Sequence, residues 1–158
     1  MVTLVVIVAI ALSISFLCSI LEAVFLSITH AYVALLKNRG EWAGEWLEHA
    51  RRNVEEPIAA ILTLNTIAHT VGAAMAGAQA AVVFGDRWVG VFSGVLTIAV
   101  LLATEIIPKT IGATYWKRLT RPSAHVLRAM IVSMKPILIP LKWLSQLITP
   151  STDRPTVS

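Results

Sequence analysis

The sequence predicts an all-helical integral membrane domain with three transmembrane helices. Hydrophobic residues make up 56% of the 158 residues and charged residues only 14%, whereas soluble domains carry about 25% charged residues. The apolar residues form blocks long enough to cross the ~30 Å hydrocarbon core of a bilayer. Lysine and arginine cluster beside these blocks, as is typical of loops on the cytoplasmic side of a membrane. The length fits a single domain.

Composition also excludes other kinds of partner and site. The formal net charge is +4, but the basic residues do not form a stripe interleaved with aromatic residues, so no nucleic-acid partner is expected. Cys18 is the only cysteine, and one thiol makes neither an internal disulfide nor a zinc site. We expect it to be a small buried hydrophobe.

The first predicted span covers residues 2–28, where Glu22 is the only charged residue. A signal peptide is the alternative, but the stretch is too long, lacks a basic start and contains a carboxylate. Residues 30–57 instead mix acidic and basic residues at helical spacing, with Trp42 and Trp46 on an apolar side. This pattern predicts one or two amphipathic helices against the membrane surface.

The second predicted span, residues 58–83, contains no formally charged residue. Small residues recur every fourth position along it and form two neighbouring faces, Gly72/Ala76/Ala80 and Ala73/Gly77/Ala81. Small faces let helix backbones approach closely in lipid. We therefore expect a tight helix–helix contact, either within the chain or between two copies of it.

A short turn at residues 85–87 leads into the third predicted span, residues 88–113. The loop after the first span holds four lysines and arginines, the next loop holds only Arg87, and residues 114–128 hold four. Basic residues favour the cytoplasmic side. Three spans with an external N-terminus and a cytoplasmic C-terminus satisfy this distribution.

The last apolar stretch belongs to a predicted juxtamembrane helix at about residues 121–148. Lys135 and Lys142 would be costly at the bilayer centre, and Pro136 and Pro140 interrupt helical hydrogen bonding. We therefore expect a bent helix at the interface and not a fourth span. The membrane domain is expected to cover residues 1–149, and residues 150–158 are expected to form a linker.

Polar residues inside the predicted spans are the candidate functional groups. Ser15, Ser19 and Glu22 share one helix face, Asn65 and His69 lie four residues apart, and Thr104-Glu105 precedes Pro108-Lys109. Carboxylate, amide, hydroxyl and carbonyl oxygens are the ligands of a hard cation such as Mg²⁺. Because Pro108 has no N–H, the carbonyl of Thr104, four residues earlier, is expected to be free for a cation.

Each of these residues also has a structural alternative. The serine hydroxyls can bond their own backbone, and the Asn65 amide can join two helices. Lys109 can extend to the headgroups or pair with Glu105, while His69 can be a satisfied polar residue. Ionisable residues within a membrane are nevertheless functional candidates by default. Glu105 is the strongest single candidate.

Three sequence motifs resemble the transmembrane module of the CorC/CorB and CNNM magnesium transporters. They are Ser19-Ile-Leu-Glu22-Ala, Leu64-Asn65, and Glu105-Ile-Ile-Pro108-Lys109-Thr-Ile-Gly112. The resemblance covers about residues 1–150, and the Glu-x-x-Pro-Lys stretch is its most specific part. It implies a homodimer with three spans per subunit in the plasma membrane, which is the inner membrane in bacteria.

The resemblance further implies a transported Mg²⁺ ion held by Ser19, Asn65 and Glu105, with export often described as driven by Na⁺. Candidate accessory residues are Glu22, Thr66, His69, Thr104, Pro108 and Lys109. Members of the family continue into ATP-binding cystathionine-β-synthase (CBS) domains, which are expected in the full-length protein and absent from this chain. The sequence departs from the bacterial pattern at Leu21, Thr66 and His69, so accessory ligands and ion coupling stay open.

Two other functions compete with transport. A membrane-embedded enzyme is not expected, because His-Glu-x-x-His is absent and both aspartates lie outside the spans. A non-transporting membrane anchor that senses Mg²⁺ is the more serious alternative, because the same site would serve it. Flux through a reconstituted membrane separates the two.

Overall fold

The computed structural model describes residues 1–148, with side chains through residue 140, and this part of the chain contains helices and no strands. The predicted linker at residues 150–158 lies outside the described residues. Three helical segments are long and apolar enough to cross a membrane, so the chain is a membrane protein. They run Val2–Ser27, Glu55–Phe84 and Asp86–Thr114, within three residues of the predicted bounds.

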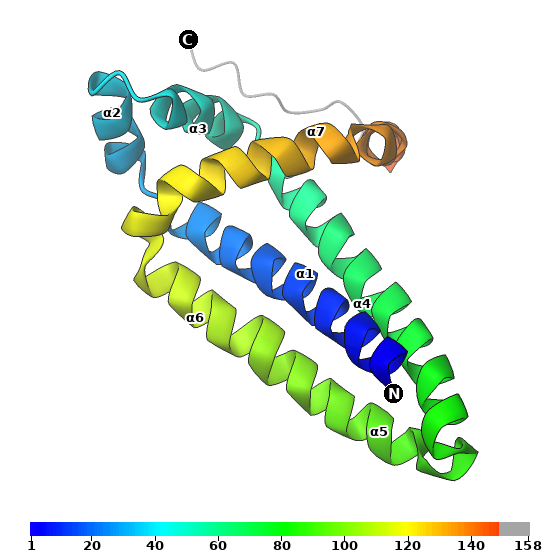
Figure 1. Ribbon diagram of the computed structural model, residues 1–158. Coiled ribbons are helices and arrows are strands. Elements are labelled where there is room, and N and C mark those ends of the chain that lie inside the picture. Colours follow the sequence, from blue (N-terminus) through cyan, green and yellow to red (C-terminus); the bar gives the residue numbers. More distant parts are fainter. Residues whose placement is uncertain (149–158) are drawn as a thin grey trace.

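The first two segments are single helices, α1 (Val2–Ser27) and α4 (Glu55–Phe84). The third consists of α5 (Asp86–Val100), a π-helical turn η1 (Leu101–Ile106) and α6 (Ile107–Thr114). Figure 1 shows α1 between α4 and this composite helix. α4 and α5 meet at Gly85, whose φ of 80° lies in the region that favours glycine. The N-terminus lies at this same end, the Gly85 end (Figure 1).

The remaining helices gather at the opposite end, the α7 end (Figure 1). One or two amphipathic helices were expected within residues 30–57, and the structure has two, α2 (His30–Asn38) and α3 (Trp42–Arg52). α7 (Trp116–Ile148) begins five residues earlier than expected and contains three prolines. A proline removes one backbone hydrogen bond, which bends a long helix without ending it where packing holds both sides. Figure 1 shows α7 turning toward its C-terminal end, as the predicted bend requires.

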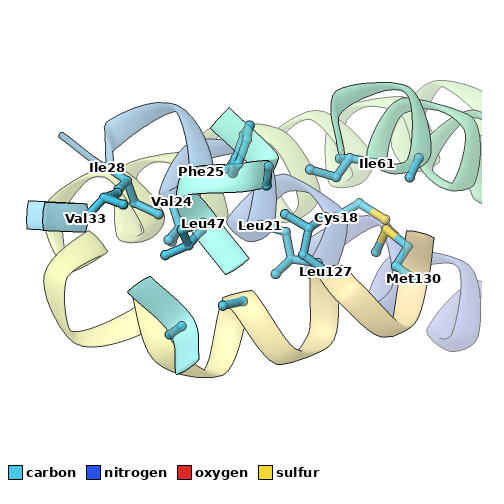
Figure 2. Close-up of a cluster of buried hydrophobic side chains, with 14 of the residues drawn as sticks. Cys18, Leu21, Val24, Phe25, Ile28, Val33, Leu47, Ile61, Leu127 and Met130 are labelled. Atoms are coloured by element: carbon cyan, nitrogen blue, oxygen red, sulfur yellow. The ribbon is translucent and has the colours of Figure 1, made fainter. Parts of the chain in front are cut away.

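The main hydrophobic core lies at the α7 end, where α1, α3, α4 and α7 converge (Figure 2). Figure 2 shows Leu21 of α1 beside Leu127 of α7 and Val24 of α1 beside Leu47 of α3, while Ile61 of α4 belongs to the same cluster. Cys18 is fully buried within this cluster, as expected of a hydrophobic cysteine. This core fixes the last turns of α1 against α7.

The small-residue face of α4 packs within the chain. A Cβ added at Gly72 would lie 2.5 Å from the Cβ of Ala11 in α1. Ala76 and Ala80 of α4 are buried beside Leu4 of α1. The predicted close helix–helix contact is therefore the α1–α4 interface, while the neighbouring Gly77 has open space at its Cβ position.

Candidate metal-binding site

The predicted Glu-x-x-Pro-Lys motif lies where the third span widens into the π-helical turn η1. The backbone N–H of Ile107 donates to the carbonyl of Leu102, five residues back. Pro108 cannot continue a hydrogen-bond ladder, and an extra residue in the preceding turn accommodates that break. With this five-residue spacing, the carbonyl opposite Pro108 is that of Ala103. The expected free carbonyl at Thr104 assumed a regular α-helix, and it stays a prediction.

Asn65 connects the three spans. Its Oδ1 accepts a hydrogen bond of 2.7 Å from the Ser15 hydroxyl of α1. Its Nδ2 donates to Oε1 of Glu105 at 3.3 Å. Asn65 is half-buried within α4, so this one amide joins α1 to η1 through α4.

His69 lies one turn further along α4 and extends the same network. Its Nε2 contacts the hydroxyl of Ser15, and it lies 3.5 Å from Oγ1 of Thr104. The Thr104 hydroxyl also donates to the Val100 carbonyl at 2.9 Å. His69 is thus a hydrogen-bonded polar residue at the edge of the oxygen cluster, and Thr104 is buried beside it.

Two carboxylates and one ammonium lie on the α7 side of Asn65. Nζ of Lys109 is 3.0 Å from Oε2 of Glu105 and 3.2 Å from Oε2 of Glu22. Glu22 and Glu105 belong to different spans, and the side chains of both are about a quarter exposed or less (21% and 26%). The formal charge of the three groups is −1. Lys109 therefore pairs with Glu105, as one of its two alternatives predicted, and also joins α6 to α1.

Ser19 is fully buried, and its Oγ has no hydrogen-bond partner among the described residues. It lies between Ser15 and Glu22 on one face of α1, and both of those residues contact the groups around Glu105. A buried hydroxyl without a partner carries a desolvation cost of about 1–3 kcal/mol. An unsatisfied oxygen at this position is suited to a ligand.

The structure separates the nine predicted residues into three groups. Seven lie together or on the shared face of α1: Ser19, Glu22, Asn65, His69, Thr104, Glu105 and Lys109. Pro108 is buried and contributes through the backbone, while Thr66 is exposed and away from the cluster. Ser15 was predicted on this helix face but not as a ligand or accessory residue, and it joins Asn65 to His69. Its place four residues before Ser19 predicted the shared face.

The donor set favours a hard cation. Among the described residues no three His, Cys, Asp or Glu side chains converge as they do in a typical transition-metal site. The converging atoms are instead hydroxyl, amide and carboxylate oxygens, which suit Mg²⁺ or Ca²⁺. A cavity of about 230 Å³ between α1, α4 and α5 reaches this cluster at His69 from the Gly85 end. Val8, Leu12, Gly72, Phe92 and Thr97 are among the residues that line it.

Known proteins resemble this chain over most of its length. The family model described as the cyclin M transmembrane N-terminal domain matches residues 6–158. A UPF0053 protein of Synechocystis sp. is 35% identical over 133 residues, which are 84% of this chain and 37% of that protein. The UPF0053 inner membrane protein YfjD of Escherichia coli is 28% identical over 114 residues, which are 72% of this chain and 26% of that protein.

A UPF0053 protein of Haemophilus influenzae is 28% identical over 142 residues, which are 85% of this chain and 33% of that protein. The chain thus spans about a third of the length of these relatives. The family model covers nearly the whole chain, including all three spans and α7. The chain belongs to the cyclin M (CNNM) transmembrane domain family, a transporter-type family of membrane domains.

Proposed function

We propose that this chain is the ion-conducting part of a Mg²⁺ transporter, with Ser19, Asn65 and Glu105 as the ligands of the transported ion. The observation that carries the proposal is the oxygen cluster around Glu105, which all three spans build inside the membrane. A carboxylate at this depth is costly unless a cation, a base or water accompanies it. The partnerless hydroxyl of Ser19 supplies a further oxygen on the facing helix.

The widened turn contributes to the same site. A π-turn shifts the register of the helix, and it exposes backbone carbonyls that α-helical bonding would satisfy. Such irregular backbone is tolerated in a membrane where it lines a cavity or a site. Carbonyls next to Glu105 are therefore additional oxygen ligands for an ion that takes six.

The proposed topology places the Gly85 end outside and the α7 end in the cytoplasm, because the basic residues gather at the α7 end. The bacterial inner membrane is the proposed location, and the word "inner membrane" in the name of the E. coli relative supports it. We further propose a homodimer, export of Mg²⁺ with Na⁺ as the coupling ion, and regulatory ATP-binding domains in the full-length protein. The relatives are about three times as long as the stretch that matches this chain, which is compatible with the last point.

The test is Mg²⁺ flux through liposomes that contain the purified chain, measured with and without a Na⁺ gradient. The parent protein should move Mg²⁺, and Ser19→Ala should reduce both binding and flux. Ser13→Ala is the matched control, since Ser13 is exposed and donates to the carbonyl of Ala9 in its own helix. Mg²⁺ binding without flux would identify a sensing anchor. Equal flux in both serine variants would remove Ser19 from the ligand set.

A further inference from the structure

Lys109 contacts both carboxylates of the cluster, which come from two different spans. Its ammonium lies 3.0 Å from Oε2 of Glu105 and 3.2 Å from Oε2 of Glu22. A lysine that only extends to the headgroups would point away from these groups. A simple i, i+4 helix pair would need one carboxylate and not two. Stabilisation of a single helix therefore does not explain why Lys109 contacts two carboxylates.

The ammonium occupies an oxygen that the proposed cation also needs. Oε1 of Glu105 accepts from Asn65, and Oε2 faces Lys109. A divalent ion that binds both Glu105 and the Asn65 carbonyl oxygen would lie within a few ångströms of the ammonium. Like charges at that separation repel strongly where water is scarce. The ion and Lys109 therefore cannot both hold Glu105 closely.

The geometry gives the ammonium a second position. Glu22 lies on the turn of α1 that follows Ser19, and it already contacts Nζ of Lys109. The lysine side chain is 43% exposed, so its long stem has room to move. Glu22 can hold the ammonium after Glu105 has passed to the ion.

We propose that Lys109 is a tethered competitor of the transported cation, and this inference rests on the proposed function. Between release of one ion and arrival of the next, its ammonium neutralises Glu105, so that the membrane domain never carries two unpaired carboxylates. On binding, the ion displaces the ammonium to Glu22. On release, the ammonium returns and lowers the affinity of the site. Lys109 is thus a positioning residue for ion release, and Glu22 holds its ammonium while the ion is bound.

The inference is tested by the Mg²⁺ affinity of the purified chain, measured by titration calorimetry. Lys109→Met removes the competing charge at nearly constant length and should tighten Mg²⁺ binding by about tenfold or more. Lys109→Arg keeps the charge and should bind no more tightly than the parent. Glu22→Gln removes the second position, confines the ammonium to Glu105 and should weaken binding. In liposomes Lys109→Met should also transport more slowly at saturating Mg²⁺, because release is slowed.

The outcomes separate this inference from the proposed function. If the parent binds Mg²⁺ and Lys109→Met binds it equally or more weakly, Lys109 is a structural ion-pair partner and the inference is overturned. If the parent binds no Mg²⁺, the proposed function fails first. If Lys109→Met does not fold, the double variant Glu22→Gln/Lys109→Met has one carboxylate fewer to leave unpaired. It should bind Mg²⁺ more tightly than Glu22→Gln alone, and equal affinity would overturn the inference.

Discussion

α1 and α5 are both apolar helices of membrane-spanning segments, yet the fold uses them in opposite ways. α1 buries seven residues, including Ser15 and Ser19. No residue of α5 is buried within the described part of the chain. α1 is enclosed by α4, α6 and α7, whereas α5 packs mainly against α4, with Phe92 and Leu96 toward the cluster of Leu4, Ala76 and Ala80. Two apolar helices of the same fold therefore have very different surroundings.

Their hydroxyl groups show the same contrast. On α5 the Thr97 hydroxyl donates to the carbonyl of Ser93 in its own helix, at 2.8 Å. On α1 the Ser15 hydroxyl crosses to Asn65 of α4. A hydroxyl satisfied by its own backbone is compatible with lipid, while one that bonds across helices marks an interior face. The interior polar face is therefore on α1, while α5 has no buried residue within the described part of the chain.

The largest difference is expected between truncations of equal size in the two regions. Leu21 is 1% exposed in the core at the α7 end, and Ile98 of α5 is 60% exposed. Leu21→Ala should lower the free energy of unfolding by about 2–5 kcal/mol, because it leaves a cavity. Ile98→Ala should change it by about 0.5 kcal/mol or less. Denaturant unfolding in detergent measures both, and equal losses would show that α5 is covered in solution.

A second pair of variants tests how closely α6 and α5 approach their neighbours. A Cβ at Gly112 would lie 2.8 Å from the Cβ of Ala23 and 2.9 Å from the carbonyl oxygen of Ile20. Gly112→Ala should therefore cost about 1–3 kcal/mol of stability through overpacking. Gly94 of α5 has open space, so Gly94→Ala should stabilise the helix by about 0.5–1 kcal/mol. A destabilised Gly94→Ala protein would instead indicate a second copy packed on α5.

Long-range features of the sequence were sufficient to predict the fold. Several local details of the structure were not predicted. The apolar blocks and basic clusters indicated the spans, because hydropathy and charge act over many residues. The π-turn at residues 101–106 was missed. It differs from a regular helix only in that each hydrogen bond spans one more residue, and amino-acid composition does not indicate such a change. The start of α7 at Trp116 was also missed, because packing against α1 and α3 extends the helix across Pro122.

In the candidate site, too, the overall arrangement was predictable from the sequence and the individual contacts were not. Helical spacing placed Ser15, Ser19 and Glu22 on one face, and the structure keeps that face inside. It gave no means of telling Thr66, which is exposed, from its neighbour Asn65, which is in the cluster. Only the rotation of α4 against α1, set by close contact at Gly72, decides which of the two points inward. The Glu22–Lys109 contact likewise depends on which spans are neighbours.

The smallest effect is expected at the exposed ion pair between α7 and the segment before α3. Arg121 donates two hydrogen bonds to Glu41, which lowers the pKa of the Glu41 carboxyl. A lowered folded-state pKa contributes stability that is present above the unfolded value, about 4.3, and is lost as pH falls through the folded value. The melting temperature should therefore fall more between pH 7 and pH 3 in the parent than in Glu41→Gln.

Glu45→Gln is the control for this comparison, since Glu45 forms no ion pair among the described residues. Its pH dependence should follow that of the parent. The difference in pH dependence between the parent and Glu41→Gln should also become smaller at high salt, because the ion pair is exposed and screened. If Glu41→Gln and Glu45→Gln behave alike, the Glu41–Arg121 contact does not hold α7 in place.

Mg²⁺ flux by Glu105→Gln in liposomes tests most sharply whether Glu105 holds the transported ion. The change keeps the size of the side chain and one of its oxygens but removes the charge. Mg²⁺ sheds its tightly held water only for strong compensation, so flux should be abolished or sharply reduced. The variant should still fold, because a neutral amide is less costly to bury than a carboxylate. Transport of Mg²⁺ by Glu105→Gln at the parent rate and affinity would show that Glu105 does not hold the transported ion.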